Sequence, residues 1–298
     1  MAAEEHVVEQ APTASEYIVH HLTHWQNKPQ TEIVDFSVFN IDSLFFSITL
    51  GLIGCFFLWK AARRATSGVP GRFQAAVEIL MEMVDGQAKS IVHNANSRKM
   101  VAPLALTVFV WIFLLNAMDL LPLDFLPTIW AMIYGAAGHD PHHAYLRVVP
   151  TADLSVTMGL SVSVLFICLF YNVKIKGIGG WAHELVSAPF GTSKNPVFFV
   201  ILAIINIAEQ LISFTAKTVS HGMRLFGNMY AGELVFMLIA LLGGSWAMSF
   251  EAGDLMLLLL HVVAGWAWAV FHIIIILLQA FVFMMLTLVY IGQAHDAH

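Results

Sequence analysis

The thirteen residues HGMRLFGNMYAGE, at 221–233, place charged side chains inside an otherwise apolar part of the chain. The segments before and after them, FFVILAIINIAEQLISF and LVFMLIALLGG, consist mostly of residues suited to lipid or to a dry core. Arg224 cannot lose its charge in a protein, and Glu233 follows it nine residues later. Ionisable groups at membrane depth are expensive and mark ion pathways by default. We therefore treat Arg224 as a functional residue rather than a headgroup anchor.

Helical spacing separates these two charges. Each residue of a helix turns by about 100°, so Arg224 and Asn228 share a face, which Lys217 joins. Glu233 lies about 900° from Arg224, which leaves it half a turn away. The spacing predicts two polar environments on opposite sides of one helix, not an ion pair within it.

A second polar pattern lies in the last apolar segment. Asp254, His261, His272 and Gln279 are spaced by 7, 11 and 7 residues, close to whole helical turns. They predict one polar stripe, whose simplest use is to face the polar side of the preceding helix. Imidazole titrates near neutrality and can exchange protons with a carboxyl group. We expect Glu233, His272 and Gln279 to line one hydrated, titratable path.

The composition identifies the class of protein. Of 298 residues, 58% are hydrophobic and 11% are charged, with a mean hydropathy of +0.75. A soluble domain carries roughly 25% charged residues, so this chain is an integral membrane protein. Its apolar runs are continuous rather than alternating, which predicts an all-α fold rather than a barrel. The small net charge of −6 makes nucleic acid an unsuitable partner, and the separated Cys55 and Cys168 form no metal or disulfide motif.

Apolar runs divide the chain into a polar leader at 1–40 and a single membrane domain at 41–298. We expect about five spans, at about 43–60, 100–118, 154–173, 196–243 and 254–291. At ~1.5 Å per residue the last two exceed a hydrocarbon thickness of ~30 Å, which predicts a long, tilted or bent helical hairpin. The segment FQAAVEILMEMVDGQAKSIVHN has charges among its apolar positions and predicts an amphipathic helix on the membrane surface.

Basic residues orient these spans. The segments 60–72, 98–99 and 174–194 carry the lysines and arginines that mark a cytoplasmic side. This places the N-terminus and the loop at 122–150 outside and the C-terminus inside. We expect that loop to contain a short re-entrant or interfacial turn.

Several polar residues also have ordinary explanations. Asn116 could hydrogen-bond between helices, and Asp119 and Asp124 could cap an interfacial turn. The loop histidines lie in polar segments without a partnering carboxylate pattern, so we interpret them as solvated and predict no metal site. These histidines are His20, His24, His139, His142 and His143.

Several motifs occur together in one order. HGMRLFGNMYAGELVF followed by VFHIIIILLQAFVFMMLTLVY closely resembles subunit a of the bacterial F-type ATP synthase. NAMDLLPLDFLP, ATSGVPGRFQ, RVVPTADLSVT and VKIKGIGG are similar to that family's connecting motifs. The resemblance covers most of the chain from about residue 40.

The resemblance implies a stator subunit of the Fo proton channel, which is not an enzyme by itself and needs no cofactor. Its expected partners are a rotating ring of c subunits, the b-subunit peripheral stalk, other ATP synthase subunits and membrane lipids. Protons enter through one half-channel, neutralise a ring carboxylate, ride the ring and leave through a second half-channel. The ion is H+ or Na+, and the pairing of His272 with Glu233 favours H+. The location implied is the bacterial inner (plasma) membrane.

Motif matching assigns residues to these parts. Arg224 is the arginine that separates the half-channels. On the inlet side lie Asn228, Glu233, His272 and Gln279, with Asn116 and Asp119 at the outer vestibule and Asp153 as a weaker member. On the exit side Gln210 occupies the register where some relatives have a glutamate. The weaker exit candidates are Glu209, Ser213 and Ser220.

Two other classes stay open from the residues alone. A stand-alone ion channel or secondary transporter would work by itself, but we find no internal repeat or Gly/Pro-broken helix pair. A membrane metalloenzyme would use the histidines, but the chain has no HExxH motif.

Overall fold

The structure is a computed structural model that describes residues 13–32, 35, 37–244 and 252–295. Within these residues the chain is helical and has no strand, apart from one isolated bridge between Gln26 and Asn40. The helices are α1 (Ala14–Leu22), α2 (Ile41–Arg63), α3 (Arg72–Ile91), α4 (Ala95–Ala117), η1 (Met118–Leu120), α5 (Phe125–Ala136), η2 (Pro141–His143), η3 (Pro150–Ala152), α6 (Leu154–Ser187), α7 (Pro196–Gly244) and α8 (Ala252–Gln293). The prediction of an all-α fold is confirmed.

Five of these helices are long and apolar enough to cross a membrane: α2, α4, α6, α7 and α8. This confirms the predicted number of spans. The largest difference is in α6, which we expected to end near residue 173 but which reaches Ser187. Gly177, with φ of 72°, interrupts α6, so the residues after it form a second helical segment rather than a longer straight helix.

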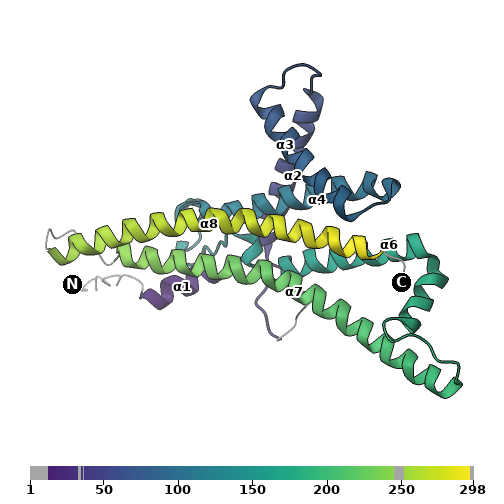
Figure 1. The fold of residues 1–298 in the computed structure, drawn as a ribbon. Coiled ribbons are helices and arrows are strands. Elements are labelled where there is room, and N and C mark those ends of the chain that lie inside the picture. The colour runs from purple at the N-terminus through teal and green to yellow at the C-terminus, as the bar shows by residue number, and fades with distance from the viewer. Residues whose placement is uncertain (1–12, 33–34, 36, 245–251, 296–298) are drawn as a thin grey trace, which may run out of the picture.

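The hairpin of α7 and α8 forms one side of the bundle. The two helices run side by side, while the N-terminal part of α7 diverges from α8 and meets the end of α6 (Figure 1). Asn206 fixes that meeting point, because its side chain donates to the carbonyls of Val186 and Gly191. The turn at 245–251 lies outside the described residues, and the tilt of the hairpin in a membrane stays a prediction.

The core lies where α4, α6, α7 and α8 meet. Fully buried side chains from these helices include Ile112, Leu225, Met229, Met284 and Leu288. Helices α6 and α7 approach closely at Gly222, where an added Cβ would lie 2.8 Å from the sulfur of Met158. Burial of these apolar side chains stabilises the bundle that holds the polar groups in place.

Helix α3 confirms the predicted amphipathic helix. Val84 and Ala88 are buried against the bundle, where α3 contacts α4 and α8, and an ion pair between Lys89 and Asp85 lies about 100° around the helix, where both side chains are exposed. Together α2 and α3 project from the side of the bundle (Figure 1). The position of α3 on a membrane surface stays a prediction.

The loop at 122–150 contains the 12-residue helix α5, and its predicted re-entrant or interfacial position outside stays a prediction. The N-terminal region contains α1, which begins with a capping box: Glu16 N–H donates to Thr13 Oγ1, and Thr13 N–H donates to the Glu16 carboxylate at 2.8 Å. Residues 1–12 of the predicted leader and 296–298 of the predicted cytoplasmic end lie outside the described residues.

Candidate functional site

Helix α7 presents different side chains on two faces. Ser220, Arg224 and Asn228 are exposed, whereas Leu225, Met229 and Glu233 are buried, as the nine-residue spacing predicts. The one hydrogen bond that Arg224 forms to another described side chain is with Ser220, where Nη2 lies 3.4 Å from Oγ. Among the described residues, Arg224 forms no ion pair. A permanent positive charge therefore stands on an exposed face of an apolar helix.

Glu233 has a partner that the sequence did not suggest. Arg147, from the loop before α6, approaches its carboxylate with Nη2 at 2.6 Å from Oε2 and Nε at 3.2 Å from the same oxygen. Both side chains are buried, at 6% and 4% exposed. At these distances each group provides a hydrogen-bond partner for the other in a place shielded from water.

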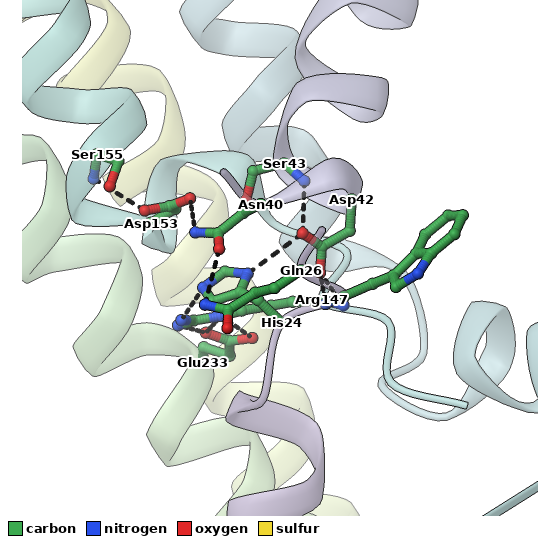
Figure 2. Close-up of polar contacts among 10 residues, drawn as sticks. His24, Gln26, Asn40, Asp42, Ser43, Arg147, Asp153, Ser155 and Glu233 are labelled. Atoms are coloured by element: carbon green, nitrogen blue, oxygen red, sulfur yellow. Dashed lines mark hydrogen bonds and ion pairs between the residues drawn. The ribbon is translucent and has the colours of Figure 1, made fainter. Parts of the chain in front are cut away.

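A histidine of the N-terminal region completes this cluster. Arg147 Nη1 lies 3.1 Å from His24 Nε2, and His24 Nδ1 lies 3.3 Å from Asp42 Oδ1 (Figure 2). Because a guanidinium can only donate, His24 Nε2 accepts and its Nδ1 donates to Asp42. Asp42 also accepts from the backbone N–H groups of Arg147 and Trp25. The interpretation of His24 as a solvated loop residue is therefore wrong: its side chain is 13% exposed and is bonded on both nitrogens.

His272 meets a different carboxylate. Its Nε2 lies 2.6 Å from Asp119 Oδ2, at ion-pair distance but without the geometry of a hydrogen bond, and both side chains are almost wholly buried. Gly232 of α7 makes room for the ring, since a Cβ there would overlap the His272 imidazole. The structure thus brings His272 to Asp119 and Glu233 to Arg147, rather than pairing His272 with Glu233.

The remaining inlet candidates differ in their surroundings. Asn116 is fully buried, and within the described residues neither side-chain atom has a hydrogen-bond partner, so the structure offers no interhelical bond for it. Gln279 is buried on α8. His261, another member of the predicted stripe, donates from Nδ1 to the Ile239 carbonyl of α7 at 2.7 Å. Asp153 caps α6 by accepting from Ser155 N–H and also accepts from Asn40 at 2.6 Å.

Two cavities flank these groups. The smaller one, called the outer cavity because it lies toward the predicted outer side, is lined by His21, Asp119 and Glu233, with about 20 Å³ of room, enough for a water molecule. The larger one, called the inner cavity, has about 350 Å³ and lies among α6, α7 and α8. Gln210 lines the inner cavity, whereas the exit candidates Glu209, Ser213 and Ser220 do not. Glu209 is exposed on another side of α7.

Helix α1 covers the outer side of the site. His21 Nε2 lies 2.9 Å from Asp124 Oδ1, and the Tyr17 hydroxyl donates to the same carboxylate at 3.1 Å. Burial raises the pKa of Tyr17, and the nearby Asp124 charge raises it further. Burial lowers the pKa of His20, and the neighbouring His21 adds to that effect. Asp124, expected to cap a turn, does precede α5, but its side chain bonds α1 instead of the α5 backbone.

Sequence reasoning missed Arg147, His24 and Asp42, which lie far apart in the chain. One signal was present: Arg147 is a charge next to apolar residues in RVVPTADLSVT, and Asp42 begins the first apolar run. His139, His142 and His143 are exposed, and His143 contacts Asp140, so a partnering carboxylate exists there. Among the described residues no three His, Cys, Asp or Glu side chains gather as a metal site.

Comparison with known proteins gives consistent matches. A family model described as ATP synthase A chain matches residues 44–292. A protein named ATP synthase subunit a from Paracidovorax citrulli is 70% identical, with 100% of both chains covered. A protein of the same name from Acidovorax sp. is 66% identical, with 100% of both chains covered. One from Psychrobacter cryohalolentis is 46% identical over 95% of this chain and 96% of its own.

Proposed function

The chain belongs to the ATP synthase subunit a family, and from this premise we propose that it is the stator half of the Fo proton channel. In this role Arg224 faces a rotating ring of c subunits, each with a carboxyl group at membrane depth. The chain provides two half-channels that end on either side of Arg224. It couples proton translocation to ATP synthesis without being catalytic by itself.

The observation that carries this proposal is the environment of Arg224. Its guanidinium stays ionised in any protein environment, yet it is exposed on an apolar helix and, within the described residues, has no carboxylate partner. An ionised group at that depth requires a counter-charge from outside the chain. A ring carboxylate meets that requirement and can also move away.

The strength of this interaction suits a moving partner. Two unit charges 4 Å apart attract by ~4 kcal/mol at an effective dielectric constant of ~20. That attraction favours a deprotonated ring carboxylate beside Arg224 but does not hold it permanently. If Glu233 neutralised Arg224 the attraction would vanish, and the structure instead pairs Glu233 with Arg147.

Protons reach the ring from the outer side along the polar groups at one end of α7 and α8. We assign Asp119 and His272 as exchanging groups, because they lie 2.6 Å apart. Glu233, Gln279, Asn116 and Asn228 complete the inlet between the outer cavity and the ring. Asp153 acts by capping α6.

The orientation and partners follow from this role. The N-terminus lies outside and the C-terminus in the cytoplasm of a bacterial inner membrane, which the multi-pass chain spans. The c-subunit ring contacts the exposed face of α7, and the b-subunit peripheral stalk holds the chain still against it. The translocated ion is H+, because imidazole and carboxyl groups both exchange protons.

Cysteine cross-linking within the assembled complex tests the ring contact. Asn228→Cys on the exposed face should form a disulfide with a cysteine placed near the ring carboxylate. Met229→Cys, one residue later but fully buried, is the matched control and should not. Equal cross-linking of both positions, or of neither while the complex remains assembled, contradicts the proposal.

A further inference from the structure

His221 has no role in the function proposed above, although it lies on α7 close to Arg224. It is 2% exposed on α7, and its ring lies 3.7 Å, centroid to centroid, from that of Phe283 on α8. Its Nε2 is buried and, among the described residues, has no hydrogen-bond partner. If His221 served only for packing, a hydrogen-bond partner for Nε2 or a phenylalanine in its place would make the fold more stable, because an unpaired buried nitrogen is costly.

The inner cavity connects this histidine to polar groups three turns away. His221 lines the same 350 Å³ cavity as Gln210, and their separation of 11 positions corresponds to ~16 Å along α7. Glu184 and Lys217 also line the cavity. The Glu184 carboxylate accepts from Lys176 at 2.7 Å with both side chains 17–20% exposed, so water reaches that part of the wall.

His221 also lies beside the proposed ring contact. It precedes Arg224 by three residues, which places the two side chains about 60° apart on the helix. Arg224 is on the exposed face, and His221 is on the adjoining side that faces the cavity. It therefore separates the cavity from the surface that carries Arg224.

The other titratable groups of the cavity are less suited to exchange protons near neutrality. Glu184 is paired with Lys176, and Lys217 donates to Gln293 at 3.1 Å. Cys168 and Tyr290 carry groups that ordinarily titrate well above neutrality. Among the residues that line this cavity His221 is the histidine, and an imidazole can both accept and release a proton.

We propose that His221 is the proton acceptor of the exit half-channel, in an inference that rests on the proposed function. An imidazole nitrogen takes the proton from the ring carboxyl group, which leaves a carboxylate for Arg224. The resulting imidazolium gives that proton to water in the inner cavity and returns to neutral. Gln210 has no titratable group, so the exit step falls to His221 in this chain.

Substitutions in the whole complex test this role. His221→Phe keeps an aromatic ring against Phe283 but cannot carry a proton, and it should lower ATP-driven pumping about tenfold or more. His221→Glu restores an exchangeable proton and should recover part of the rate, with its pH optimum moved to lower pH because a carboxyl group is the stronger acid. His183→Phe, an exposed α6 histidine that does not line the cavity, should pump normally.

Pumping by His221→Phe within twofold of the unmodified complex at every pH would overturn the inference. If His221→Phe does not assemble, a second measurement still tests the inference. In a Cys55→Ser background, silver ions added from the cytoplasmic side should reach native Cys168 in the cavity wall and block proton flux; no block would also overturn the inference. Arg224→Ala, measured in parallel, tests the proposed function separately, because normal pumping by that variant contradicts the stator role whatever His221 does.

Discussion

The two faces of α7 hold charges of opposite kind in opposite ways. On one face Arg224 is exposed, and within the described residues its polar side-chain contact is the neutral Ser220. On the other, Glu233 is buried and bound by Arg147 at 2.6 Å. Within the described residues the chain therefore neutralises one charge and leaves the other without a counter-ion. The proposed role of Arg224 beside a moving carboxylate requires that difference.

The difference also separates two kinds of arginine. Arg147 is enclosed by Glu233, His24 and Asp42 in the first turn of α2, and its bonds tie α7 to the N-terminal region. Arg224 ties nothing within the described residues except one turn of its own helix. We expect removal of Arg147 to damage the fold and removal of Arg224 to damage coupling.

The largest stability effect is expected for Arg147→Ala. It leaves the Glu233 carboxylate buried without its cation, and breaking such a pair costs about 3–5 kcal/mol. Subunit a should be depleted from purified complexes, which quantitative immunoblotting measures. The double variant Arg147→Met with Glu233→Gln removes both charges and should recover much of the assembly. A single variant that assembles at the normal level would show that the pair contributes little.

A smaller effect is expected where α7 makes room for His272. Gly232→Ala places a methyl group on the imidazole, and overpacking of this kind costs about 1–3 kcal/mol. We expect a lower thermal midpoint of the solubilised complex and slower pumping. Gly159→Ala on α6 is the matched control, since a Cβ there meets no atom within 4 Å. Equal behaviour of the two variants would contradict the close approach of α7 and α8.

The smallest effect concerns helix α1, which covers the site on the side of Glu233. Burial holds the pKa of His20 below its ordinary 6.5, so the docked α1 binds fewer protons than the undocked segment. Docking of α1 is therefore strongest above that value and weakens as pH falls below it. Hydrogen exchange of α1 amides, corrected for intrinsic rates, should show less protection at about pH 5.5 than at about pH 7.5. His20→Gln should remove the difference, and its persistence in that variant would assign it to another group.

Periodicity predicted the elements well. The five apolar helices follow from the continuous apolar runs, whereas the amphipathic α3 and the opposite orientations of Arg224 and Glu233 follow from turns of about 100° per residue. These are local properties, set by neighbours along one helix. The inward position of His272 and Gln279 on α8 has the same origin.

Tertiary pairing was not predictable from such patterns. Arg147 is 86 residues from Glu233, and His24 is 123 residues from Arg147. No spacing rule relates positions that distant, so Glu233 was expected beside His272 although its cation comes from the loop before α6. The exit candidates stay a prediction: which side of α7 faces a cavity depends on where α6 turns at Gly177, and spacing along α7 does not determine that.

Proton flux through complexes carrying substitutions at Arg224 tests the central claim most directly. Arg224→Ala should insert and assemble but lose ATP-driven pumping and open a passive proton leak, because no fixed charge separates the half-channels. Arg224→Lys should fail almost as badly, since a compact, strongly hydrated ammonium does not replace the planar guanidinium. The measurement is flux in liposomes with and without ATP. Normal ATP-driven pumping by Arg224→Ala would show that this arginine is an ordinary surface charge and would contradict the account.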